Sequence, residues 1–366
     1  MKLANILEVL EAWAPLALQE DYDNAGLITG NPEMEISSAL ICLDSTETVI
    51  DEAIQQGCNL IIAHHPIVFS GLKKFNGKNY VERALIKAIK NDIAIYAIHT
   101  NLDNTLSGVN SFIAEKLNLK NTRILAPVSG NLRKLFTYIT PEHADKLRDA
   151  LFEAGAGSIG NYDRCSFNTE GNGTFRGNEI SNPKLGEKGE WRKEKEIKIE
   201  VLFPAHLEGK ILAALRAAHH YEEIAYEIIA LQNKDQTTGA GLTGELQQSQ
   251  TPDSFLAFVA QKMNCDCIRY TKSPKQTISK VALCGGSGSF LLQSAIQSGS
   301  DVLLTSDFKY HQFFDADDKI MILDIGHYES EQFTINGIGN FLRKKFPTFA
   351  LRFSETNTNP IQYFHR

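Results

Sequence analysis

Cysteine is scarce in this chain, and long apolar runs are absent from its sequence. Six of the 366 residues are cysteine and no two form a Cys-x-x-Cys pair, which argues against a disulfide framework. Cys265 and Cys267 are separated by one residue, but without a second pair they do not predict a thiolate metal site. No segment approaches the roughly 18 consecutive apolar residues of a membrane helix, and the first residues show no apolar signal core. We therefore expect a cytoplasmic protein with reduced thiols and no membrane contact.

Basic clusters and nucleotide-binding fingerprints are also missing. The formal net charge is −7, and lysine and arginine do not gather into a stripe, so we expect no direct nucleic-acid binding. The segment Gly285-Gly286-Ser287-Gly288-Ser289 lacks the third glycine of Gly-x-Gly-x-x-Gly, is not followed by Gly-Lys-Ser/Thr and does not fit Gly-x-Ser-x-Gly. A phosphate at the N-terminus of the next helix and an ordinary tight turn explain these glycines about equally well.

Potential metal ligands are present in three clusters, each directly after a β-rich apolar run. Residues 59–63 lead into His64-His65, residues 93–98 lead through His99 to Asp103, and residues 320–326 lead into His327 and Glu331. In open α/β sheets, ligands bind outside the carboxyl ends of the strands. The shared placement therefore predicts that the three clusters form one metal site.

Two adjacent histidines favour two metal ions over one. Neighbouring side chains on a strand point to opposite faces, but at a strand end they can diverge and hold two ions, which lie roughly 3.5–4 Å apart in paired-metal hydrolases. His327 and Glu331 are four residues apart and share one face of a helix, so Glu331 can bridge the ions while His327 caps one. His99 can be a further ligand or can support Asp103. The mixed nitrogen and oxygen set suits Zn²⁺, Mn²⁺, Fe²⁺ or Co²⁺.

A further polar loop follows the apolar run 301–305. Its Asp307 and His311 are candidates for acid and base catalysis, and Lys309 is a candidate for holding an anionic substrate group. Asp44 and the pair Asp23-Asn24 are candidates for supporting the ligands.

The chain is organised as a split domain with an insertion. Residues 1–127 and 236–366 alternate β-rich runs with helical stretches, as βαβ units do. Residues 128–235 contain a weak repeat in which a strand meets a proline suited to the first turn of a helix, which predicts a ferredoxin-like module. Its Gly- and Asn-rich segment 168–189 is expected to be a loop. The expected fold class is α/β, with helix-flanked sheets interrupted by an α+β insert.

Four stretches resemble a known family. The stretches are Asp23-Asn24-Ala25-Gly26-Leu27, Ile62-Ala63-His64-His65-Pro66-Ile67, His99-Thr100-Asn101-Leu102-Asp103 and Gly326-His327-Tyr328-Glu329-Ser330-Glu331. In combination they resemble the Nif-three-like family, whose members are often labelled GTP cyclohydrolase 1 type 2 homologues. The resemblance spans almost the whole chain outside its middle, where longer members of the family carry a domain like the signal protein PII or CutA.

The resemblance implies a dinuclear metal centre and a ring-like homohexamer. In that family the metals are held at the positions that match His64, His65, Asp103, His327 and Glu331. The family label implies a hydrolase that opens the imidazole ring of GTP with a metal-activated water. The alternatives are a non-catalytic regulatory or metal-handling protein with a ligand-sensing insert, and a DNA-regulatory role, against which the acidic balance argues.

Overall fold

The computed structural model describes residues 1–364, which form two compact units. The first unit combines Met1–Ala126 with the chain from Thr237 onward, and the second is Pro127–Gln236. Each unit has its own hydrophobic core. Among the described residues, no helix combines the length and the apolar character that crossing a membrane requires.

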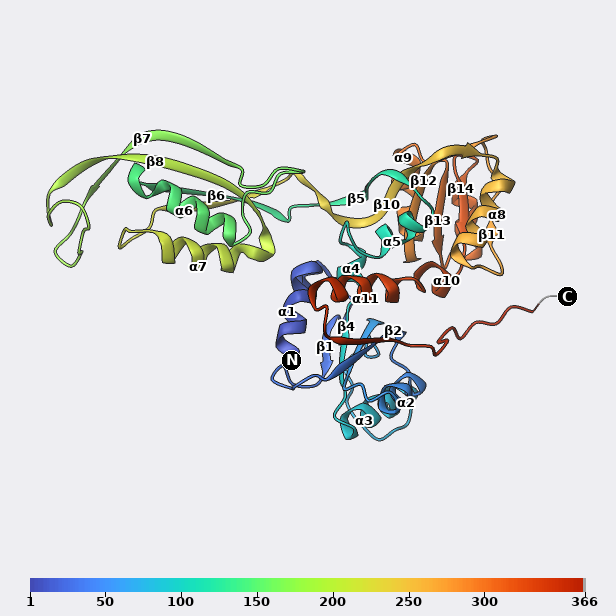
Figure 1. The fold of residues 1–366 in the computed structure, drawn as a ribbon. Helices are drawn as coiled ribbons and strands as arrows, with labels where there is room; N and C mark the ends of the chain where they lie inside the picture. Colours follow the sequence, from blue (N-terminus) through green and yellow to red (C-terminus); the bar gives the residue numbers. More distant parts are fainter. Residues whose placement is uncertain (365–366) are drawn as a thin grey trace. The chain divides into compact units, whose positions relative to one another are not determined.

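The first unit contains a five-stranded sheet in the order β1-β4-β3-β2-β15 (Figure 1). β15, β2, β3 and β4 run parallel, and β1 is antiparallel to β4. The central strands are buried because helices cover both faces, as continuous apolar runs predict. The strands are β1 Gly26–Thr29, β2 Ser38–Asp44, β3 Leu60–His65, β4 Ala94–Ala97 and β15 Ala350–Phe353.

Four helices cover this sheet. α2 and α3 pack on one face, and α1 and α11 pack on the other. α2 and α3 begin at side-chain caps, because Thr46 and Asn79 each accept a hydrogen bond from a backbone N–H three residues ahead. The helices are α1 Leu3–Trp13, α2 Glu47–Gln55, α3 Tyr80–Lys90 and α11 Thr334–Lys345.

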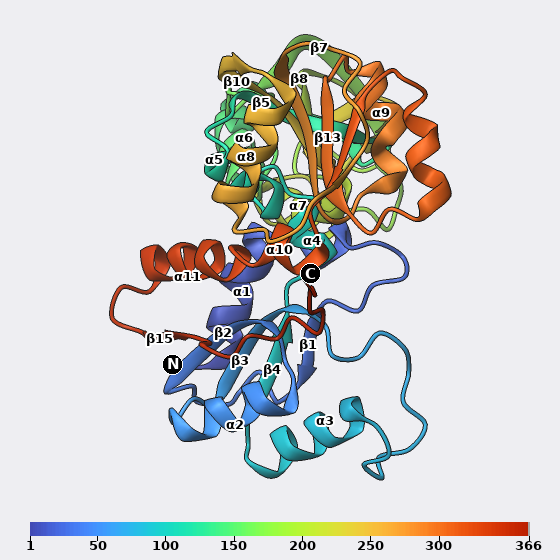
Figure 2. The same ribbon diagram turned by 90° about the vertical axis from the view of Figure 1, so that its right-hand side faces the viewer.

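The second sheet of this unit has six strands in the order β11-β14-β13-β12-β10-β5. β12, β13 and β14 run parallel, whereas β10 is antiparallel to β12 and β11 is antiparallel to β14. Figure 2 shows α5 and α8 on one face of the sheet and α9 on the other. The elements are β5 Lys120–Ser129, β10 Lys234–Gln250, β11 Arg269–Tyr270, β12 Ile278–Ser287, β13 Val302–Ser306, β14 Met321–Asp324, α5 Val109–Lys116, α8 Pro252–Met263 and α9 Leu292–Gln297.

One contiguous core joins the two sheets. It includes Ile62 and Tyr96 of the first sheet together with Leu283 and Leu304 of the second. Short helices follow the strand ends beside this core, and α10 packs against β12 and α5. The α/β expectation is therefore confirmed, and the short helices carry the polar residues described below. These helices are α4 Thr100–Asp103, η3 Ser289–Leu291, η4 Tyr310–Ala316 and α10 His327–Glu331, whereas the short helix η1 Leu16–Leu18 follows α1.

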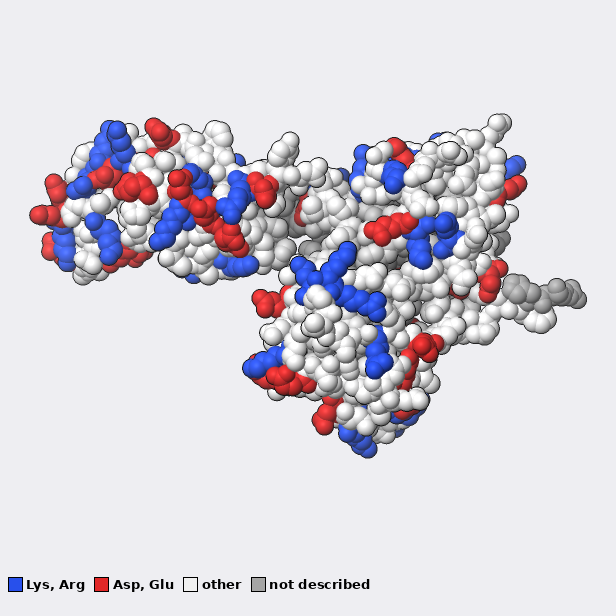
Figure 3. Space-filling view, in the orientation of Figure 1, with Lys and Arg blue, Asp and Glu red and all other residues white. Residues whose placement is uncertain are grey.

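The second unit has a ferredoxin-like topology, as predicted. Its antiparallel sheet has the order β7-β8-β6-β9, and α6 and α7 pack on it around one core. On the face shown in Figure 3, acidic and basic side chains of this unit are intermixed. The elements are β6 Leu132–Ile139, α6 Pro141–Glu153, β7 Ser166–Arg176, β8 Trp191–Pro204, η2 Ala205–Leu207, α7 Glu208–Ala218 and β9 Tyr226–Leu231.

The prediction of a loop over residues 168–189 is wrong for the first part of that segment. β7 continues to Arg176 and pairs with β8 along its whole length, from Ser166 opposite Val201 to Arg176 opposite Trp191. Glycine and asparagine have low strand propensity, but an unbroken ladder of backbone hydrogen bonds with β8 outweighs that local preference.

Candidate metal centre

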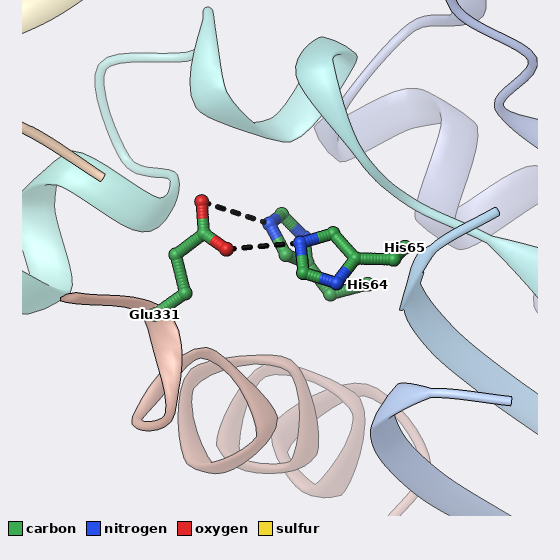
Figure 4. Close-up of side chains that lie close together, drawn as sticks. All are labelled: His64, His65 and Glu331. Carbon is green, nitrogen blue, oxygen red and sulfur yellow. Dashed lines mark hydrogen bonds and ion pairs between the residues drawn. The ribbon is translucent and has the colours of Figure 1, made fainter. Parts of the chain in front are cut away.

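β3 presents two histidines at its carboxyl end, where Pro66 stops the backbone ladder. His64 is fully buried, and its Nδ1 donates to the carbonyl of Ile98 at 2.8 Å. The Nδ1 of His65 donates to Asp44 Oδ1 at 2.8 Å. Both bonds engage Nδ1, so the two Nε2 atoms point to the other side of the rings, and Figure 4 shows them directed at Glu331.

α10 places Glu331 between the histidines. Its side chain is only 3% exposed, and its Oε2 lies 2.9 Å from His65 Nε2 and 3.2 Å from His327 Nε2. Its other oxygen, Oε1, faces His64 Nε2 at 3.8 Å. The i to i+4 spacing of His327 and Glu331 thus brings both side chains to one place, as the sequence predicted.

Asp103, the last residue of α4, completes the cluster. Its Oδ1 lies 3.8 Å from His64 Nε2. Both of these atoms are buried and have no hydrogen-bond partner among the described residues. Buried polar atoms are almost always paired, because an unpaired one carries its full desolvation cost. A pair of lone-pair donors facing each other across this distance has the chemistry of a cation site.

The donor atoms divide into two sets around Glu331. His64 Nε2, Asp103 Oδ1 and Glu331 Oε1 form one set, and His65 Nε2, His327 Nε2 and Glu331 Oε2 form the other. Ligands about 2.0–2.2 Å from a tetrahedral ion are about 3.4 Å apart, close to these separations. The donors of His64, His65 and Glu331 all lie within 4.8 Å of one another. The residues present therefore fit bound metal ions.

Three further carboxylates hold the histidine rings. Asp44 accepts from His65, Asp307 accepts from His327 Nδ1 at 2.7 Å, and Asp23 accepts from His99 Nδ1 at 2.7 Å. The ring of His99 stands edge-on to those of His64 and His65, with centroids 5.4 Å away from each. Such carboxylate–histidine pairs fix the tautomer of a ligand and its orientation.

The carboxylates change how their neighbours titrate. Burial by itself lowers the pKa of His65, but hydrogen bonds to Asp44 and Glu331 outweigh it and raise this pKa to about 9. Burial is outweighed in the same way at His327, where Glu331 and Asp307 raise the pKa to about 11. Burial raises the pKa of Asp103 to about 6. The cluster is thus a centre of negative potential that attracts cations, whether protons or metal ions.

The glycine segment at the carboxyl end of β12 serves the cluster by its small size. Gly286 has a φ of +60°, and a Cβ built on it would lie 2.5 Å from Glu331 Oε1. The backbone N–H groups of Gly285, Gly286 and Gly288 donate to Asn110, Ser330 and Thr305, respectively. These three N–H groups already donate to protein atoms, which argues against their binding a phosphate. The glycines are better explained by the close approach of Glu331 to the backbone, which leaves no room for a Cβ.

The remaining predicted residues lie farther out. Asp307 supports His327 from behind and also accepts from Ser287, and its φ of +60° is a conformation that non-glycine residues rarely adopt. Lys309 and His311 are exposed at η4, and His311 packs against Tyr310. Neither of these two side chains lines the cavity next to the cluster. The expectation that this loop as a whole faces the cavity is therefore not met.

A cavity of about 630 Å³ opens onto the cluster. His65, Asp103, His327 and Glu331 line it. Sequence reasoning missed the C-terminal segment at its edge, where Thr358 donates to Asp44 and Asn359 donates to Glu329. It also missed Asn110, whose amide joins α5 to the glycine segment. No local motif marks these residues, since each contacts a segment distant in the sequence.

Comparison with known proteins places the chain in a family. The family model described as Duf34/NIF3 (NGG1p interacting factor 3) matches residues 1–360. A Halalkalibacterium halodurans protein named GTP cyclohydrolase 1 type 2 homolog is 38% identical over 373 residues, covering 99% of this chain and 100% of that protein. A Bacillus subtilis protein of the same name is 36% identical over 365 residues, covering 98% of this chain and 97% of that protein.

The fold is shared with a solved structure as well. The crystal structure of a Bacillus cereus protein related to NIF3 matches with a TM-score of 0.86 and 36% identity, covering 100% of this chain and 99% of that one. The four motif stretches and the fold thus lead to the same conclusion as the comparisons. The chain belongs to the Duf34/NIF3 family.

Proposed function

We propose that the cluster is a two-metal hydrolytic centre. The observation that carries the proposal is the position of Glu331, whose two oxygens face two separate donor sets. His64, Asp103 and Glu331 would hold one ion, and His65, His327 and Glu331 the other. Paired divalent ions, when bound, lower the pKa of water towards about 7 and polarise the electrophile that it attacks.

The protein itself orients the donors and limits access. Asp44 and Asp307 accept the Nδ1 protons of their histidines, so each Nε2 presents its lone pair to the centre. The buried positions of His64 and Glu331 exclude bulk water from one side of the cluster. The other side opens to the cavity, which gives a small molecule a route to the donors.

This open side favours a hydrolase over the alternative of a regulatory or metal-handling protein. A structural metal site has its ligands closed around the ion, whereas a catalytic site keeps a position open. The names of the relatives suggest GTP as the substrate. The homohexamer that the family resemblance implies stays a prediction, which light scattering of the purified protein would test.

The test is elemental analysis of the purified protein combined with a hydrolysis screen that includes GTP. We expect about two metals per chain in the wild type and a loss of metal and turnover in Glu331→Gln. Glu329→Gln is the matched control, because Glu329 is buried in the same helix but contacts the C-terminal segment instead of the histidines. Full metal with no turnover on any compound would favour the metal-handling alternative, and full metal in Glu331→Gln would refute the centre.

A further inference from the structure

Large apolar side chains gather around the mouth of the cavity. Phe69 follows β3, Phe290 belongs to η3, and Tyr22, Tyr80 and Ile361 come from three other segments. Phe290 is 68% exposed and Phe69 is 55% exposed, although both are apolar. Exposed aromatic side chains that converge from distant segments on one opening are typical of a ligand-binding rim.

Positive charge is missing from the same cavity. Among the described residues no lysine or arginine lines it, whereas Glu20, Asp44, Asp103 and Glu331 do. Recognition of phosphate groups normally uses arginine, lysine or free backbone N–H groups. The N–H groups of the three glycines in the segment donate to Asn110, Ser330 and Thr305.

The metal ions of the proposed centre would not reverse this balance. Two divalent ions would bring four positive charges, against four carboxylates at or directly behind the ligands. These carboxylates are Asp44, Asp103, Asp307 and Glu331. The loaded centre would therefore be close to neutral, and a polyanion would gain little by entering the cavity.

The rim and the cluster are close enough to act on one small molecule. The ring of Phe69 stands edge-on to His99 with centroids 5.8 Å apart, and His99 in turn touches His64 and His65. A single histidine ring thus separates Phe69 from the metal donors. The cavity volume of about 630 Å³ suits a compact ligand, since small-molecule pockets span about 300–1,000 Å³.

We propose that the centre acts on an uncharged aromatic or heteroaromatic compound without a phosphate group. The inference rests on the proposed hydrolase function and narrows its substrate class, away from the GTP that the names of the relatives suggest. The planar ring of the substrate binds at the rim formed by Phe69 and Phe290, and its hydrolysable bond reaches the donor cluster. In the probe amides used below, hydrolysis would add the elements of water across the C–N bond and yield a carboxylic acid and an amine.

The first part of the test measures binding to the protein as purified, by ligand-observed nuclear magnetic resonance. The probes are benzamide, acetamide and 4-sulfobenzamide, which differ in the ring and in a distal negative charge, and guanosine with GTP as a second pair. We expect benzamide to bind severalfold tighter than acetamide, because its ring adds aromatic contacts and buried apolar area. We expect 4-sulfobenzamide to bind more weakly than benzamide, and GTP more weakly than guanosine.

The second part uses variants with metal content as an independent readout. Phe69→Ala and Phe290→Ala should weaken benzamide binding severalfold and keep the metal of the wild type. Phe314→Ala is the matched control, because Phe314 is 67% exposed on η4 and does not line the cavity. Full metal with equal binding of acetamide and benzamide, or with tighter binding of GTP than of guanosine, overturns this proposal alone. A wild-type protein that binds no metal overturns the hydrolase proposal together with it.

Discussion

Replacing Gly286 by alanine separates the metal function of the centre from its effect on stability. The residue has a φ of +60°, and an added Cβ would lie 2.5 Å from Glu331 Oε1. The left-handed conformation costs a residue with a Cβ about 1–2 kcal/mol. The clash can only be relieved if the Glu331 carboxylate moves away from its place between the two donor sets. We therefore expect loss of metal in addition to the conformational cost.

Gly299→Ala is the matched control. Gly299 also has a positive φ, +74°, but an added Cβ would meet nothing within 4 Å. Both variants should lower the melting temperature of the chelated protein by a similar amount, roughly 2–8 °C from about 2–4 °C per kcal/mol in a unit of this size. Only Gly286→Ala should lose metal in elemental analysis and fail to regain stability when metal is added back. Wild-type metal content in Gly286→Ala would refute the assigned position of Glu331.

Three other predictions concern the support of the centre, its protons and its independence from the insert. Asp44→Ala should weaken metal binding roughly 10- to 100-fold in chelator competition, because the orientation of His65 is lost, whereas Asp51→Ala, at an exposed ion pair with Lys87, should bind like the wild type. The pKa of His65 is raised from 6.5 to about 9 in the folded protein. Protonation of His65 therefore stabilises the metal-free protein, fully below about pH 6.5, and this stabilisation is lost as the pH rises to about 9. Urea titrations of chelated protein should therefore show falling stability across that window, and a flat profile would contradict the assigned contacts. Replacement of residues 127–236 by a short linker should leave the metal content unchanged, because the two units have separate cores, and loss of metal in such a chain would argue for a shared site.

The sequence predicts those parts of the centre that depend only on local secondary structure. Two histidines at a strand end and a His-x-x-x-Glu helix turn depend only on strand and helix periodicity, and the structure brings Glu331 to both histidines. The carboxyl ends of parallel strands necessarily share an edge, which is why Asp103 also arrives there.

Long-range contacts could not be predicted in this way. The use of the glycine N–H groups by Asn110 and Ser330, and the contact of Thr358 with Asp44, depend on tertiary packing between distant segments. The strand β7 was missed for the same reason, since the ladder with β8 overrides a composition typical of loops. Lys309 and His311 were predicted to face the cavity, and they do not line it. Their position after a strand does not fix the direction of their side chains, because the chain turns into η4 there.

The pairing of His65 with Glu331 joins positions that are 266 residues apart. An ion shared by these side chains acts as a reversible cross-link between the first and last parts of the chain. Closing a loop costs an entropy that grows with its length, by about 0.6 kcal/mol for each doubling, so a link across such a span restricts the unfolded chain more than a local one. If the proposed centre holds metal, metal supply would control how often the early and late segments separate, and the lifetime of the native protein would depend on the free metal concentration.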